Sequence, residues 1–327
     1  MKTTRRDLLK HSAAITAGMA TAPFLSAQTN EVVRKGRPLI IDTHQHLWDL
    51  SWQRLPWLKD APPVLSRSYV TSDYLEATQG LNIKAVYMEV DVSPEQHQVE
   101  ASHVVKLARD PKTPTIAAVV GGRPDGETFG DDLKFLAKSA EIRGIRQVLH
   151  GSTPQGHCLN PRFVAGVRQL GEHGLSFDLC LRPADLKDGQ KLAQLCPDTQ
   201  FVLDHCGNAD VNAFFKEDEA SREHVNSWKR DLAAISQLPN VICKISGIIA
   251  RVPEQWSAAD LAPIVNHCLD SFGPDRVVFG GDWPVCLLGA PLRAWIDSLT
   301  EILSERPEQE QRKLWSENAI KFYRLSV

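Results

Sequence analysis

Several features that mark other protein classes are missing from this sequence of 327 residues. Acidic side chains outnumber basic ones by 40 to 37, so there is no positive excess to bind nucleic acid. Beyond the N-terminal segment, no apolar run is long enough to cross a membrane. The seven cysteines are odd in number and form no Cys-x-x-Cys pair, which argues against a zinc knuckle or a complete disulfide framework. We expect most of them to be buried thiols.

The first 27 residues have the pattern of an export signal. Thr4-Arg5-Arg6-Asp7-Leu8-Leu9-Lys10 resembles the twin-arginine consensus, and a weakly apolar stretch follows up to Ala27. A basic amphipathic helix is the alternative interpretation. Cleavage after Ala27 would remove four basic side chains and one acidic one, leaving the mature chain more acidic. We therefore expect a periplasmic protein whose mature part, residues 28–327, is a single domain.

Short runs rich in β-branched residues recur between amphipathic stretches. The helix starts are readable, as in Ser93-Pro94-Glu95-Gln96, where serine can cap and proline can open a helix. Strands that alternate with helices predict parallel pairing. An open doubly wound sheet has the same alternation, but the eightfold repeat and the polar residues at strand ends favour an α/β fold of the (β/α)8 (TIM) barrel type. The predicted strands are 39–43, 85–90, 115–120, 144–149, 175–181, 200–204, 241–245 and 276–279.

The segment after the first predicted strand contains no glycine-rich phosphate loop. His44-Gln45-His46 stands in its place, which argues against NAD or ATP binding. Residues 47–70 are rich in tryptophan and proline, and we expect them to form a rigid loop over the mouth of the barrel.

The strongest candidate site begins at this His-Gln-His segment. Alternation along a strand places His44 and His46 on one face, and Asp42 has the same parity, so all three are expected to point toward the barrel axis. Two converging imidazoles suit a metal ion, and they equally suit the binding of a carbonyl oxygen. Either histidine alone would be interpreted more simply as a structural residue.

Two further candidates come from the ends of later strands. Asp204-His205 closes an apolar run, and alternation predicts that His205 faces the pocket while Asp204 supports it. Asp282 ends another run and is the best candidate for a general base, with a helix N-cap as the alternative. Arg146 is expected to be buried against Glu89 or Asp178. The candidates for substrate contact are Glu89, His150, Arg182, Lys244, Trp48 and Trp283.

From Leu39 to about Tyr323 the sequence resembles the amidohydrolase-related branch of the amidohydrolase superfamily. Within it, the resemblance is to sugar-lactone hydrolases such as L-fuconolactonases and L-rhamnonolactonases. One departure is Gly281, where such lactonases usually have serine. The segments that carry the resemblance are 42–49, 56–58, 177–183, 202–207, 243–247 and 279–285.

The resemblance implies hydrolysis of a cyclic ester such as an aldonolactone. Asp282 would take a proton from the attacking water, and His44, His46 and His205 would surround the carbonyl. Superfamily members with two metals also need a histidine at the end of strand five, and none is present between Asp178 and Arg182. The resemblance therefore implies one divalent metal, zinc, held by His44 and His46 with His205 and Asp282, or no metal.

Two other functions stay open on the sequence alone. One is a metal-dependent amide hydrolase or decarboxylase of the same superfamily, and the other is a carbohydrate-binding barrel without catalysis. The expected partner is a small sugar-derived molecule. A homo-oligomer is neither indicated nor excluded.

Overall fold

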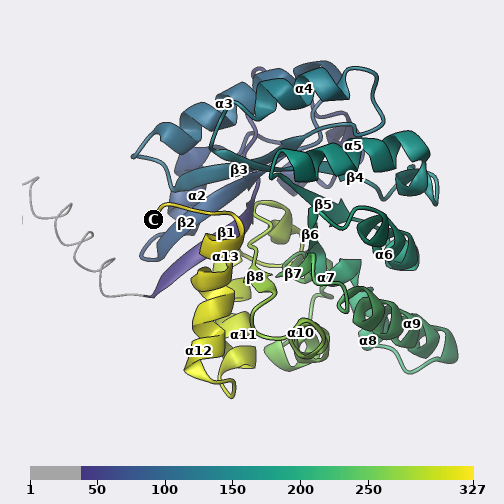
Figure 1. The fold of residues 1–327 in the computed structure, drawn as a ribbon. Helices are drawn as coiled ribbons and strands as arrows, with labels where there is room; N and C mark the ends of the chain where they lie inside the picture. The colour runs from purple at the N-terminus through teal and green to yellow at the C-terminus, as the bar shows by residue number, and fades with distance from the viewer. Residues whose placement is uncertain (1–37) are drawn as a thin grey trace, which may run out of the picture.

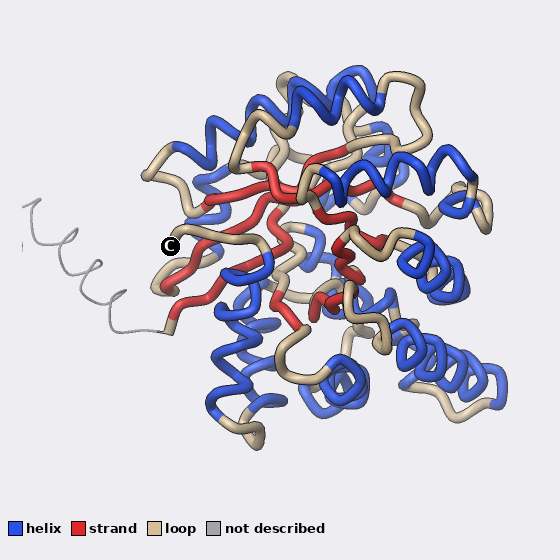
Figure 2. Tube along the Cα trace, viewed as in Figure 1, coloured by secondary structure: helices blue, strands red, loops and turns tan. Residues whose placement is uncertain are grey.

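The computed structural model describes residues 38–327, in which eight parallel strands follow one another in chain order. Each strand is hydrogen-bonded to the next, and helices lie around the outside of the sheet (Figures 1 and 2). Gln45 bridges Trp283 beyond the last strand, and the His46 amide donates to the Trp283 carbonyl at 2.8 Å. These contacts join the first and last strands, so the predicted (β/α)8 barrel is confirmed. The strands are β1 (Leu39–Gln45), β2 (Asn82–Met88), β3 (Thr115–Gly121), β4 (Ile142–Val148), β5 (Ser176–Cys180), β6 (Gln200–Leu203), β7 (Val241–Ile245) and β8 (Val277–Phe279).

All eight predicted strands are present, with ends that differ by at most three residues from those expected. Strand ends shift because they depend on the pairing partner as well as on local composition. The helices are α2 (Thr71–Ala77), α3 (His97–Arg109), α4 (Phe129–Leu136), α5 (Pro161–Glu172), α6 (Leu186–Leu195), α7 (His205–Asn208), α8 (Val211–Phe214), α9 (Glu219–Ile235), α10 (Ala258–Phe272), α11 (Leu292–Leu303), α12 (Glu308–Arg312) and α13 (Asn318–Phe322).

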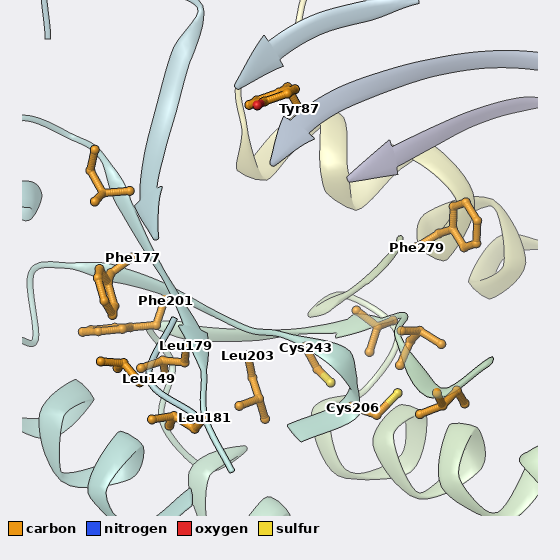
Figure 3. Packing of buried hydrophobic residues seen from close by; sticks show 14 of the residues in the cluster. Tyr87, Leu149, Phe177, Leu179, Leu181, Phe201, Leu203, Cys206, Cys243 and Phe279 are labelled. Atoms are coloured by element: carbon orange, nitrogen blue, oxygen red, sulfur yellow. The ribbon is translucent and has the colours of Figure 1, made fainter. Parts of the chain in front are cut away.

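Alternation along the strands separates two apolar clusters. The larger one lies between the sheet and the helices, and Figure 3 shows part of it around Phe177, Phe201 and Leu203. The smaller cluster fills the base of the barrel. Because it is closed by residues from α13 and the chain end, the C-terminal segment plugs the end of the barrel opposite the strand C-termini. Its buried members are Ile41, Val86, Met88, Ala117, Val119, Val202, Ile242, Val278, Ala319, Tyr323 and Leu325.

The tryptophan-rich loop at 47–70 is held against the barrel mouth by specific hydrogen bonds. The Trp57 indole N–H donates to the Val90 carbonyl at 2.8 Å. The Gln96 side chain binds the loop twice, donating to the Trp52 carbonyl and accepting from the Arg54 amide. Ser93 occupies the N-cap position and Pro94 opens a 3-10 turn over residues 94–96 before α3, as expected, but the serine hydroxyl forms no cap hydrogen bond.

Several expectations about the whole chain can be compared with the structure. All seven cysteines lie within the described range and are free and buried, as predicted. In residues 38–327 no helix is both long and apolar enough to cross a membrane. The predicted twin-arginine signal, residues 1–27, lies outside the described residues.

One carboxyl group is buried between α3 and the sheet. Glu100 accepts hydrogen bonds at Oε1 from the Tyr87 hydroxyl at 2.8 Å and the Val90 amide at 3.0 Å, while its Oε2 has no partner. Burial, followed by the charge of Glu89, raises the pKa of Glu100 to about 8. The folded protein therefore binds this proton more tightly than the unfolded chain does.

We expect Glu100→Gln to stabilise the protein increasingly as the pH rises from about 5 to about 8. In wild type, the proton on Glu100 stabilises the folded protein. This stabilisation is fully present at a pH below the pKa of Glu100 in the unfolded chain, and it is lost as the pH rises through the higher pKa in the folded protein. The amide of glutamine does not titrate, so the variant has no such loss. Calorimetry should give a melting temperature about 2–4 °C above wild type at about pH 8.5 and little difference at about pH 5.

The partly buried Glu141 provides a control, because its hydrogen bond with Arg109 lowers the pKa of that carboxyl. Glu141→Gln should differ from wild type by the same amount throughout this pH range. A Glu100→Gln difference that does not grow with pH would contradict the expected titration.

Candidate active site

The end of β1 delivers two histidines to the mouth of the barrel, but not Asp42. Pairing with β2 is irregular between Asp42 and Gln45, and this bulge breaks the alternation of side chains. Asp42 lies in the outer layer, where it accepts hydrogen bonds from the Tyr74 hydroxyl and the Gly281 amide. The expected common face of Asp42 and the two histidines is therefore wrong for Asp42. The His44 and His46 rings lie 4.8 Å apart.

His205 and Asp282 both follow strand ends on left-handed backbone, with φ of 55° and 53°. Such φ values are uncommon for residues other than glycine and cost free energy, so they persist where the surroundings fix them. They turn both side chains into the mouth. The His205 ring is 4.4 Å from that of His44, and Asp282 Oδ1 lies 3.5 Å from His46 Nε2. Simple alternation would have placed His205 opposite Asp204, but the turn brings both to the same site.

One glycine allows the close approach that His205 needs. Gly247 follows β7 with φ of 72°, and a Cβ atom there would lie 2.3 Å from Nδ1 of His205. That nitrogen is 3.0 Å from the Ser246 hydroxyl, which fixes the orientation of the ring. Only glycine combines this backbone conformation with so short a contact.

The electrostatic environment separates the protonation states of these groups. Burial lowers the pKa of His205 to about 4, and burial together with the charge of Lys244 holds the pKa of His44 well below its usual value. For Asp282, burial alone would raise the pKa, but His205 and His46 bring it below the ordinary value. At neutral pH an ionised carboxylate therefore faces neutral imidazoles of His44 and His205.

A layer of buried charges lies directly beneath this site. The Lys244 ammonium is 2.8 Å from Asp178 Oδ2, 2.9 Å from Asp204 Oδ1 and 3.2 Å from His44 Nδ1. None of these four side chains has exposed surface. Burial raises the pKa of Asp178 to about 7 even beside Lys244, whereas Lys244 and His44 hold the pKa of Asp204 well below its usual value despite burial. The network therefore fixes His44 from below.

Arg146 approaches His44 from the other side. Its Nη1 lies 3.1 Å from His44 Nε2, and its Nε donates to Glu89 Oε1 at 2.6 Å. The predicted pairing of Arg146 with Glu89 is confirmed, and Arg146 also lines the pocket. His44 thus lies between two cations, which is consistent with its neutral state.

A pocket of about 330 Å³ opens above these residues. It has the size of a small-molecule site, with a polar floor and mostly apolar walls. Five of the predicted site residues border it, namely His46, Trp48, His150, His205 and Asp282. The remaining lining residues are Trp57, Val90, Asp91, Arg146, Val148, Cys180, Gly247, Ala250, Arg251, Val285 and Leu288.

Four of the predicted substrate contacts lie elsewhere. Lys244 and Glu89 are buried beneath the pocket in the ion pairs described above. Arg182 lies outside it, donating to Asp185 and to the Thr153 carbonyl. Trp283 is 2% exposed and packs edge to face against Tyr69 and Tyr74, so it supports Asp282 from behind.

Arg251 is a charged pocket residue that the sequence analysis did not identify. It ends the 3-10 turn Ile248–Arg251, labelled η6, and is held by Asn208 from the turn after β6. Neither alternation nor a motif marks it, because its position depends on two loops that meet only in the folded barrel.

The residues at the mouth also fit a single divalent ion by type and spacing. His44, His205 and Asp282 each offer one ligand atom, and these atoms lie within 4.8 Å of one another. His46 Nδ1 is 3.0 Å from the Met88 carbonyl, which leaves Nε2 directed toward Asp282. The Arg146 guanidinium, however, lies against His44 Nε2 and would compete with an ion for that nitrogen.

Comparison with known proteins places the chain among relatives with the same fold. A family model described as Amidohydrolase matches residues 41–325. An L-fucono-1,5-lactonase of Burkholderia multivorans is 29% identical over 88% of this chain and 96% of its own length. The protein y4mH of Sinorhizobium fredii is 30% identical, with 88% and 98% covered. The structure of an amidohydrolase from Burkholderia multivorans with bound Zn has a TM-score of 0.77 at 25% identity, covering 88% of this chain and all of that one.

Removing the buried ammonium should destabilise the protein far more than removing a matched exposed one. Lys244→Met leaves Asp178 and Asp204 without their cation, and we expect a loss of about 3–5 kcal/mol in the free energy of unfolding. The exposed pair of Lys134 and Asp131 has the same 2.8 Å separation, so Lys134→Met should change stability very little. Urea unfolding of both variants tests this, and equal losses would rule out the buried network as a source of stability.

Proposed function

The chain belongs to the amidohydrolase family, and from that premise we propose that it hydrolyses the ester bond of a sugar lactone. The observation that carries the proposal is the position of Asp282. Its carboxylate faces His46 at 3.5 Å and His44 at 3.7 Å in a pocket bordered by Trp48 and Trp57. Trp48 is 1% exposed and supports Trp57, and the partly exposed Trp57 is suited to contact with the C–H surface of a sugar ring.

The proposed reaction places the lactone carbonyl at the floor of the pocket. Asp282 accepts a proton as water attacks the carbonyl carbon, and the developing negative charge on oxygen faces the N–H donors of Arg146 and the histidines. When the ring C–O bond breaks, Asp282 returns the proton to the leaving alkoxide. The product is an open hydroxy acid. A divalent ion held by the residues named above would supply Lewis acidity at the same carbonyl.

We expect Asp282→Asn to lower kcat/KM on a panel of sugar lactones by about 10²–10⁴-fold, because an amide of the same shape cannot accept the proton. Acid release measured at constant pH is the assay. Asp275→Asn, a surface variant whose carboxylate contacts Lys313, is the control and should retain wild-type turnover. Near-wild-type turnover by Asp282→Asn would exclude Asp282 as the base.

A metal-dependent amide hydrolase or decarboxylase is the second candidate, favoured by the ligand spacing of His44, His205 and Asp282. A metal bound there would have to tolerate the cations on both sides of His44. Because Arg146 can polarise the carbonyl itself, we expect at least about half of the lactone hydrolysis to survive chelation.

Elemental analysis before and after chelation, with activity measured in parallel, separates the two candidates. Stoichiometric zinc whose removal abolishes turnover would favour the second. Full activity in the metal-free protein would count against it.

A further inference from the structure

One cation at the pocket has no carboxylate partner. Arg251 lines the pocket, and among residues 38–327 it forms no ion pair with an aspartate or glutamate. The other arginines near the mouth are each neutralised: Arg146 by Glu89, Arg123 by Asp91 and Arg182 by Asp185. The positive charge of Arg251 is therefore available to a ligand.

The guanidinium is held in place by uncharged groups. Its Nη2 donates to Asn208 Oδ1 at 2.5 Å, and its Nη1 donates to the Asn208 carbonyl at 3.2 Å. Asn208 is 3% exposed, has φ of 54° and donates to the Leu181 carbonyl at 2.6 Å. An arginine oriented in advance loses less freedom on binding an anion, and neutral oxygens leave its charge intact.

His150 borders the same pocket and adds a neutral donor. His150 keeps exposed surface, but desolvation at the pocket wall, followed by the charges of Arg146, Arg251 and Arg182, lowers its pKa to about 4. At neutral pH its ring can donate one N–H without contributing charge. Asp91 also lines the pocket but is paired with Arg123 at 3.0 Å, so it does not neutralise Arg251.

The walls near Arg251 restrict where a charged group of the substrate can lie. Ala250, Val148, Val285 and Leu288 also line the pocket and offer no polar side chain. An anionic substituent would therefore bind at Arg251, while the ester lies at the floor beside Asp282. A pocket of about 330 Å³ has room for a six-carbon ring acid.

We propose that Arg251, with His150, binds a carboxylate on the lactone, so that the substrate is the lactone of a sugar diacid rather than a neutral aldonolactone. This inference rests on the proposed function and narrows its substrate class. Arg251 is then a specificity residue that binds a substrate group other than the reacting carbonyl.

The test compares an aldonolactone with the matching aldarolactone. The two differ only at the carbon farthest from the ester carbonyl, which is CH2OH in the aldonolactone and a carboxylate in the aldarolactone. We expect wild type to have a kcat/KM at least about tenfold higher on the aldarolactone, as a charged hydrogen bond allows. Arg251→Gln should lose this preference through a higher KM, with turnover of the neutral lactone changed less than about threefold. Arg251→Lys should retain part of it.

Arg168→Gln is the matched control, because it removes the same charge from an arginine that contacts the Leu195 carbonyl on the outside of the barrel. It should keep the wild-type preference. Equal rates of wild type on both lactones would overturn the proposal. An equal loss of kcat/KM on both lactones in Arg251→Gln would also overturn the proposal, because Arg251 would then act at the reacting carbonyl.

A binding measurement separates failure of this inference from failure of the proposed function. Calorimetric titration of Asp282→Asn with an aldarate and with the matching aldonate requires no turnover. Tighter binding of the aldarate that disappears in the double variant with Arg251→Gln supports the carboxylate site even if no lactone is hydrolysed. Equal binding of the two acids overturns it.

Discussion

The ammonium group of Lys244, buried between Asp178 and Asp204, is the interaction on which the mouth of this barrel depends. Asp178 lies in β5, Asp204 directly follows β6 and Lys244 lies in β7, so the ion pairs fix the relative positions of these strand ends. Loss of the cation would leave Asp178 buried without an ion-pair partner and Asp204 with only the guanidinium of Arg146, 3.5 Å away. The same ammonium touches His44 and, with Arg146 on the opposite side, sets both its position and its neutral state.

The barrel interior is divided along its axis according to chemistry. Small and β-branched residues fill the base, where residues of the C-terminal segment close it. The buried ions form the next layer, and the pocket lies above them. The residues that stabilise the fold therefore lie at the N-terminal ends of the strands, and the candidate catalytic residues lie at the C-terminal ends. Loops at the C-terminal ends can vary without disturbing the packed base.

The groups that face the pocket are positioned largely by unusual backbone. His205, Asn208 and Asp282 have left-handed φ values, and Gly247 begins the turn that carries Arg251. Such residues cost about 1–3 kcal/mol each, so they are stable only on a rigid support. The ion pairs and the apolar base supply that support. His205 and Asp282 are thereby directed at one point, while Asn208 holds Arg251 at the wall of the same pocket.

The sequence by itself determined the strands and the residues that end them. Runs such as Phe201–Leu203 are local signals, and parallel strands in a barrel bring their C-terminal ends together, so local pattern alone predicts that the residues ending these strands share one site. That group comprises His44, His46, His205 and Asp282. Only the tertiary structure decided how deep each side chain lies and which way it points. Asp42 points outward, and the bulge after it turns His44 inward. Lys244 lies below the pocket, and Arg251 reaches the pocket from a turn without a motif. These outcomes depend on register shifts and on contacts between loops far apart in the chain, which local composition does not encode.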